Sequence, residues 1–122
     1  MVTFDAVRAL ALALPGVEET TSYGTPAFKV RGKLIARLQE EGDVLVVKAE
    51  IGHRDALIAA RPDVYFVTPH YKESRYVLVR LAAVDRDELA DLLADAWHLV
   101  APKRLATSLP SERKPGESRA DS

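Results

Sequence analysis

A run of residues between positions 23 and 39 contains four cations and no acid, although the net charge of the whole chain is −1. The four cations are Lys29, Arg31, Lys33 and Arg37. A local cationic surface of this kind favours anionic partners such as phosphate groups. Because the chain as a whole is not basic, any contact with nucleic acid is expected to be local.

The same run predicts a β-hairpin with the three-residue loop Val30-Arg31-Gly32, in which Gly32 takes the left-handed conformation that a type I turn with a bulge requires. Side chains then alternate between two faces. The face turned to the core carries Phe28, Leu34, Ala36 and Leu38, and the other face carries Lys29, Lys33, Ile35 and Arg37. A two-residue loop, Arg31-Gly32, would mix these two sets, so the longer loop is preferred.

In this register Lys29 lies directly opposite Lys33, a like-charge pair that costs about 0.2–1 kcal/mol. A bound phosphate would relieve the repulsion. The alternative is purely structural, because lysines on edge strands deter sheet-to-sheet aggregation. Lys48 and Arg80 could extend the same face.

A second candidate contact is the loop Thr68-Pro69-His70-Tyr71-Lys72 between two predicted strands. His70, beside Tyr71 and Lys72, could bind phosphate, stack on a base or transfer a proton. The alternative is a rigid turn in which Pro69 fixes the backbone and His70 has no role.

Lys103 and Arg104 follow the last predicted helix directly. Cations at that position complement the negative end of the helix dipole, which is worth about 0.3–1 kcal/mol. This structural role is sufficient to explain them, and contact with a nucleic-acid backbone is the alternative.

No catalytic or metal-binding constellation is evident in the sequence. The three histidines are far apart and form no HExxH pattern, and no Gly-x-Ser-x-Gly motif occurs. The absence of cysteine excludes disulfides, thiolate metal sites and a cysteine nucleophile. We therefore expect a binding protein with no catalytic residues, no cofactor and no metal.

Hydrophobic periodicity and turn residues predict the element order α-β-β-β-α-β-β-α, which is typical of an α+β two-layer sandwich with a mostly antiparallel sheet and helices on one face. The surest element is the last helix, which opens with an Asp85-x-x-Glu88 capping box. The other predicted elements are a helix from the Thr3 cap to about Leu14, an extended piece at Glu18–Ser22, the hairpin, a strand from Val44 to about Ala49, a helix at Gly52–Arg61, and strands at Val64–Thr68 and Tyr76–Leu81.

Residues 1–106 are predicted to form one domain, and residues 107–122 are predicted to be a disordered polar tail. The N-terminus lacks the pattern of a signal peptide, and no run approaches the roughly 20 apolar residues that span a bilayer. These features predict a cytoplasmic protein without membrane contact.

Four segments together resemble the MmcQ/YjbR family of small bacterial proteins. They are Leu14-Pro15-Gly16-Val17-Glu18-Glu19, Gly24-Thr25-Pro26-Ala27-Phe28-Lys29-Val30, Phe66-Val67-Thr68-Pro69-His70-Tyr71 and Ala96-Trp97-His98-Leu99-Val100-Ala101-Pro102-Lys103-Arg104. The resemblance implies a fold similar to the CyaY-like (frataxin) sandwich. It also implies a double-wing DNA-binding protein whose wings are hairpins.

The leading hypothesis is a DNA-binding protein that contacts backbone phosphates with little sequence specificity. The residues expected to do so are Lys29, Arg31, Lys33, Arg37, His70, Lys72, Arg75, Lys103 and Arg104. The alternative is a protein-interaction or small-ligand-binding adaptor that uses the uncovered face of the sheet, where Ile35 and Tyr76 would matter more than the charges.

Overall fold

The computed structural model describes residues 2–22, 24–39 and 42–102 of the chain. The predicted polar tail, together with Lys103 and Arg104, lies outside these residues. In chain order the elements are α1 (Phe4–Leu12), β1 (Val17–Ser22), β2 (Thr25–Val30), β3 (Lys33–Leu38), β4 (Val44–Lys48), α2 (Ile51–Ala60), β5 (Tyr65–Phe66), the 3-10 helix η1 (Pro69–Tyr71), β6 (Tyr76–Arg80) and α3 (Arg86–Val100).

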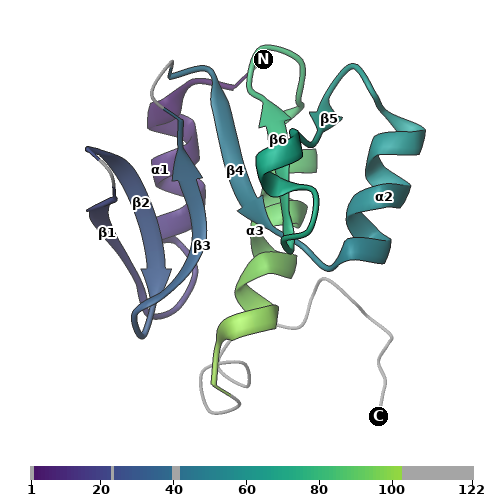
Figure 1. Cartoon of the computed structure of the whole chain (residues 1–122). Helices are drawn as coiled ribbons and strands as arrows, with labels where there is room; N and C mark the ends of the chain where they lie inside the picture. The colour runs from purple at the N-terminus through teal and green to yellow at the C-terminus, as the bar shows by residue number, and fades with distance from the viewer. Residues whose placement is uncertain (1, 23, 40–41, 103–122) are drawn as a thin grey trace, which may run out of the picture.

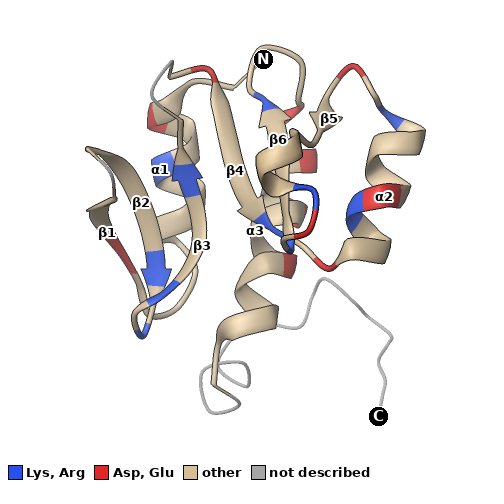
Figure 2. Ribbon diagram, viewed as in Figure 1, with Lys and Arg blue, Asp and Glu red and all other residues tan. Residues whose placement is uncertain are grey.

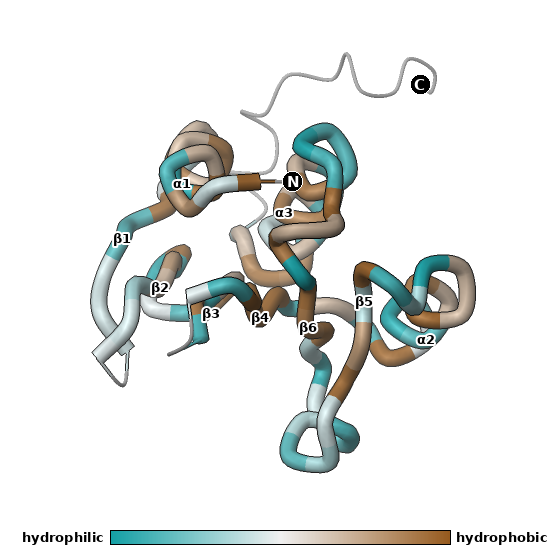
Figure 3. Tube along the Cα trace, turned by 90° about the horizontal axis from the view of Figure 1, so that it is seen from above, coloured by the Kyte–Doolittle hydropathy of each residue, from teal (hydrophilic) through white to brown (hydrophobic). Residues whose placement is uncertain are grey.

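The six strands form one antiparallel sheet in the order β1-β2-β3-β4-β6-β5. Helices α1 and α3 lie against one face of the sheet, and α2 lies beside β5 at its edge (Figure 1). In the view from above, the segment between β5 and β6 projects on the side opposite to α1 and α3 (Figure 3). The predicted α+β sandwich is confirmed, with the main core between the sheet and these two helices.

Helix α3 forms as its sequence predicts. At its capping box, the Glu88 carboxylate accepts a hydrogen bond from the backbone N–H of Asp85 at 3.4 Å. Its apolar stripe faces the sheet, and Trp97 is fully buried. The indole Nε1 of Trp97 donates a 2.7 Å hydrogen bond to the carbonyl oxygen of Pro15, which ties α3 to the segment that follows α1.

Three predicted elements differ from the structure by more than a residue at one end or in their pairing. Helix α1 begins at the Thr3 cap but ends at Leu12. The extended piece near residues 18–22 pairs with β2, so four strands rather than three precede α2. The strand expected at Val64–Thr68 is reduced to Tyr65–Phe66, because the chain turns into η1 at Pro69.

The turn between β2 and β3 has two residues, and the predicted three-residue loop is wrong. Val30 pairs with Lys33, which leaves only Arg31 and Gly32 in the turn. Both residues are left-handed, with φ values of 52° and 82°. Positive φ at both central positions is the mark of a type I′ turn, whose twist matches that of the flanking strands.

A β-bulge in β3 follows this turn. Lys29 pairs with Leu34, whereas Phe28 pairs with Ala36, so Ile35 is the extra residue. A bulge re-aims the side chains that follow it. The two-residue turn places Leu34 opposite Lys29 on the outer face and Ile35 on the core face, and the bulge then keeps Ala36 in the core as well, so Ile35 is fully buried rather than exposed among the cations.

Lys29 and Lys33 consequently lie on opposite faces of the sheet, and their predicted juxtaposition is wrong. Lys33 is paired with the core residue Val30, so it lies on the face covered by helices. Lys29 lies between Phe28 and Val30, both of which face the core, and so it lies on the opposite face. The like-charge repulsion inferred from the sequence does not exist in this register.

Candidate functional site

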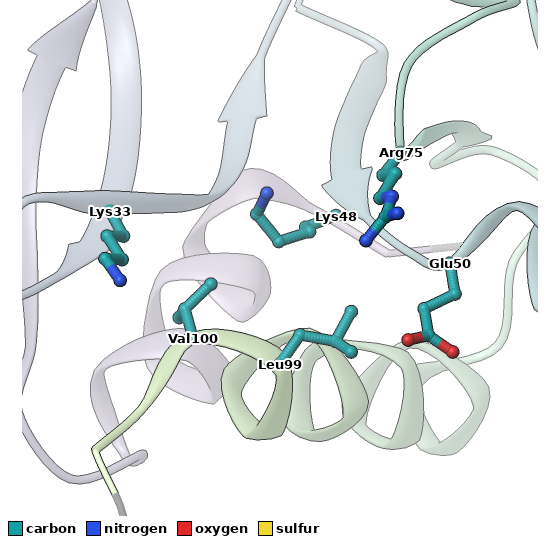
Figure 4. A pocket seen from close by; sticks show the side chains of 6 residues that line it. All are labelled: Lys33, Lys48, Glu50, Arg75, Leu99 and Val100. Atoms are coloured by element: carbon teal, nitrogen blue, oxygen red, sulfur yellow. The ribbon is translucent and has the colours of Figure 1, made fainter.

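A pocket of about 310 Å³ lies at one end of the sheet, between the strand ends and the last turn of α3 (Figure 4). We call it the sheet-end pocket. It is lined by Lys33, Lys48, Glu50, Arg75, Leu99 and Val100.

Antiparallel pairing brings the three cations of the pocket together. Lys33 is the first residue of β3, Lys48 is the last residue of β4, and Arg75 directly precedes β6. Since β3 pairs with β4 and β4 pairs with β6, these three positions lie at the same end of the sheet. A hydrogen bond of 2.9 Å from the backbone N–H of Ala49 to the carbonyl oxygen of Arg75 extends the ladder there.

The cations of the sheet-end pocket are not neutralised by ion pairs. Within the described part of the chain, none of Lys33, Lys48 and Arg75 lies within ion-pair distance of a carboxylate. Lys48 has an aromatic neighbour instead, because its Nζ lies 4.8 Å from the ring centroid of Tyr76. The pocket carries three cations against one carboxylate, that of Glu50, and so has an excess of positive charge.

Two arginines elsewhere in the domain, Arg8 and Arg61, form ion pairs with carboxylates. Arg8 donates hydrogen bonds of 2.7 and 2.9 Å to Glu19, and this contact lowers the pKa of the Glu19 carboxyl below its ordinary value. Arg61 forms ion pairs with Asp63 and Glu88 at 3.4 and 3.5 Å. The cations at the sheet end thus differ from these arginines, and Figure 2 shows several basic positions near that end.

Arg31 projects at the tip of the β2–β3 turn and is exposed. Its φ of 52° is a conformation that glycine or asparagine adopts more readily than arginine. The backbone therefore gains nothing from arginine at this position, which leaves the charge as the property that arginine contributes.

Lys29, on the opposite face, has an acidic neighbour. Its partner on β1 is Glu18, and opposite charges on paired strands attract each other. Lys29 is thus separated from the sheet-end pocket by the sheet itself, and its neighbour on the paired strand is a carboxylate, although the two side chains form no ion pair.

The Arg37 side chain is fixed by hydrogen bonds to two other side chains. Its guanidinium donates hydrogen bonds to the Tyr71 hydroxyl at 2.9 Å and to Thr25 Oγ1 at 3.3 Å. These contacts connect β3 to the segment between β5 and β6. Arg37 therefore has a structural role on the face opposite to α1 and α3.

The sheet face opposite to α1 and α3, which was expected to be uncovered, is partly closed. Val46 and Leu78 lie on it, yet they are 1% and 0% exposed. The segment between β5 and β6 lies on this side (Figure 3). Because Ile35 is buried in the core, its expected role on an open apolar surface is wrong.

His70 and Lys72 are exposed in the segment that covers this face. The rings of His70 and Tyr71 are in edge-to-face contact, with their centroids 4.9 Å apart.

Of the predicted nucleic-acid contacts that lie within the described residues, Lys33 and Arg75 meet in the sheet-end pocket. Arg31 lies at the adjoining turn, whereas Lys29 and Arg37 lie on the other face.

Several residues of this region were not among the predicted contacts. The sequence indicates Lys48 only as a possible extension of the basic face. Glu50, Leu99 and Val100 join the pocket through long-range packing that no local pattern signals. Arg54, a buried arginine that binds the backbone near Arg75, was also missed.

Metal-binding clusters and membrane spans are both absent from residues 2–22, 24–39 and 42–102. No group of three or more His, Asp or Glu side chains there is placed to hold a metal ion. No helix within these ranges is both long and apolar enough to cross a membrane.

Comparison with known proteins places this chain in a family. Residues 12–99 match the family model described as YjbR. The chain is 45% identical over 120 residues to the uncharacterized proteins Rv2570 of Mycobacterium tuberculosis and Mb2600 of Mycobacterium bovis, covering 86% of this chain and 93% of each relative. The crystal structure of Deinococcus radiodurans protein DR2400, described with the domain DUF419, superposes with a TM-score of 0.75 at 25% identity, covering 98% of this chain and 96% of that one. The chain therefore belongs to the YjbR family.

Proposed function

We propose that this protein binds DNA through backbone phosphates, using the basic side chains gathered at the sheet end. The observation that carries the proposal is the convergence of Lys33, Lys48 and Arg75 at the ends of three neighbouring strands without carboxylate partners among the described residues. The exposed Arg31 lies at the turn beside Lys33 and extends the basic surface. Cations left free of ion pairs are available to replace the counterions of phosphates.

Phosphate contacts position a protein on nucleic acid but carry no direct sequence information. The proposed binding is therefore of low sequence specificity. The proposal includes a binding role without catalysis and a location in the bacterial cytoplasm, where such a protein would encounter DNA.

The decisive experiment is a fluorescence-polarisation titration of the full chain on labelled DNA at several salt concentrations. If about four phosphates are contacted, log K is expected to fall with log salt at a slope of about −3.6 on duplex DNA. Absence of binding at low salt, or binding that salt does not weaken, would contradict the proposal.

A matched pair of variants tests the location of the contacts. Arg75→Gln removes a cation from the sheet-end pocket and is expected to weaken binding several-fold while making the salt slope shallower by about 0.9. Arg86→Gln removes an exposed cation from the first position of α3, at the opposite end of that helix from the pocket, and should leave binding unchanged. Equal effects of the two substitutions would argue against a localised surface.

A further inference from the structure

We propose that the sheet-end pocket takes one nucleotide, either as a free nucleoside monophosphate or as an unpaired nucleotide of a nucleic-acid strand. In its strand form the inference rests on the proposed function and adds to it a preference for single strands over duplexes. The two ends of the pocket differ in their chemistry, and this difference points to the ligand.

The cations are spread along the pocket, whereas the carboxylate lies at one end of it. In Figure 4, Lys33 lies at one end next to Val100, and Glu50 lies at the other end beyond Leu99. Lys48 extends between these ends from the strand side, and Arg75 lies toward the end that holds Glu50. The pocket thus has a purely cationic end at Lys33, a carboxylate acceptor beside a cation at the other end, and an apolar wall between them.

Glu50 is available as an acceptor. It occupies the N-cap position of α2, but its side chain makes no capping hydrogen bond. It forms no ion pair with a described residue, although Lys48 and Arg75 line the same pocket. A carboxylate there would repel a simple anion, so a ligand that suits the whole pocket must also carry a hydrogen-bond donor.

The apolar wall is also unusual for a phosphate site. Leu99 is 43% exposed, although it is a large apolar side chain. A site for inorganic phosphate alone has no use for it. The side chains of Leu99 and Val100 instead suit the flat apolar face of a base or sugar.

A nucleotide combines the three properties that the pocket requires. Its phosphate suits the cations, its base or sugar suits the apolar wall, and an exocyclic amino group or a hydroxyl can donate to Glu50. A volume of about 310 Å³ is at the small end of ligand sites, which fits one nucleotide rather than several. A base held within a duplex is stacked and paired, so it cannot reach this wall.

The first experiment compares a labelled single strand with the duplex of the same sequence, using the full chain at low salt. The single strand is expected to bind about tenfold more tightly, because an unpaired base can bury apolar surface against Leu99 and Val100. Leu99→Ser should remove most of this preference while leaving duplex binding unchanged. Leu12→Ser is the matched control, because Leu12 is also 43% exposed but lies on α1, outside the pocket lining.

Glu50→Ala gives a second, independent signature. If the carboxylate accepts a hydrogen bond from the nucleotide, this variant binds the single strand more weakly and the duplex equally or more tightly. If the pocket is only an electrostatic surface, removing a negative charge strengthens both. The latter result would overturn the inference.

A third experiment tests whether the ligand of the pocket is a free nucleotide or a nucleotide within a strand. Calorimetry with nucleoside monophosphates and with inorganic phosphate is expected to show tighter binding of the nucleotides, and this advantage should be lost in Leu99→Ser. Nucleotide binding without strand binding would overturn the proposed function and retain the pocket as a site for a free nucleotide. Equal affinity for single strand and duplex, together with no advantage of nucleotides over phosphate, would overturn the inference and leave the proposed function standing.

Discussion

Arg54 donates a 2.9 Å hydrogen bond from Nη1 to the carbonyl oxygen of Ser74, the residue directly before Arg75. The same nitrogen donates to the carbonyl oxygens of Lys72 at 3.1 Å and Tyr71 at 3.4 Å. Arg54 is only 4% exposed. One buried guanidinium thus fixes the backbone of the segment that leads from η1 into the sheet end.

Substitution of Arg54 should therefore affect both stability and binding. Arg54→Met keeps much of the buried aliphatic volume but removes the donors, and we expect a loss of about 2–3 kcal/mol in the free energy of unfolding. Because the backbone next to Arg75 loses its support, DNA affinity should fall as well. Urea denaturation and fluorescence polarisation measure the two effects.

The control for this variant is Asp55→Asn. Asp55 pairs with Arg54 at 3.1 Å, but its side chain is 61% exposed. An exposed partner in water contributes less than about 1 kcal/mol. A cost of Asp55→Asn as large as that of Arg54→Met would show that the ion pair, rather than the hydrogen bonds to the backbone, provides the stabilisation.

A second prediction concerns Tyr65, whose hydroxyl donates a 2.7 Å hydrogen bond to Glu88. Burial of the side chain, assisted by this hydrogen bond, raises the pKa of Tyr65 above its ordinary value. The folded state therefore favours the neutral phenol. Its contribution to stability is complete below the unfolded pKa of about 10 and is lost as the pH rises from there through the folded value.

Tyr65→Phe should accordingly be less stable than the wild type by about 1 kcal/mol at neutral pH, since one hydrogen bond to a carboxylate is lost. The difference between the two proteins should shrink above about pH 10, where Tyr65 ionises in the unfolded wild type but has no counterpart in the variant. Denaturant titrations from about pH 7 to about pH 11 measure it on both sides of that unfolded pKa. A difference that stays constant or grows over this range would contradict the assignment.

The elements with a strong local signal could be predicted from the sequence, and α3 is the clearest case. Its capping box and its apolar stripe are both local patterns, and the stripe alone assigns Trp97 to the core, where the side chain is fully buried. The ends of β5 could not be predicted in the same way, because the turn that begins at Pro69 limits the length over which this strand pairs.

The hairpin could not be predicted from the alternation of side chains between two faces, because that alternation assumes an unbroken ladder of strand pairing. The bulge at Ile35 breaks it, so the adjacent residues Ile35 and Ala36 are both buried in the core. A signal was present in the sequence: the three-residue loop left a bulky β-branched residue, Ile35, among the cations. The dipeptide Arg31-Gly32 was a second signal, since glycine at that position suits a two-residue turn.

The sheet-end pocket could not be predicted, for a different reason. Lys33, Lys48 and Arg75 are far apart in the chain, and strand order alone decides that they meet. Strand order depends on long-range packing that a single sequence does not display. The predicted set of cations consequently combined residues from two faces of one sheet.

The separation of Lys29 and Lys33 by the sheet gives a third prediction. Lys33→Gln removes a cation from the sheet-end pocket and should make the salt slope shallower by about 0.9 while lowering affinity for DNA. Lys29→Gln removes the same charge from the same hairpin, but on the face where Glu18 is its neighbour. We expect this variant to bind nearly as well as the wild type.

The two lysine variants act as controls for each other, because they have equal net charge and the same substitution. Polarisation titrations at two or more salt concentrations compare them directly. If both weaken binding equally, DNA contacts the hairpin on both faces, or responds only to net charge, and the localised surface is wrong.

The last prediction concerns the left-handed turn residue Arg31. Arg31→Asn creates an Asn-Gly turn, which suits positive φ at both central positions, and should raise the free energy of unfolding by about 0.5–1 kcal/mol. The same change removes a charge beside Lys33, so affinity for DNA should fall and the salt slope should become shallower by about 0.9. Opposite changes in stability and binding are therefore expected from one substitution. A variant that is more stable and binds equally well would remove Arg31 from the proposed surface, whereas a loss of stability would contradict the type I′ geometry of the turn.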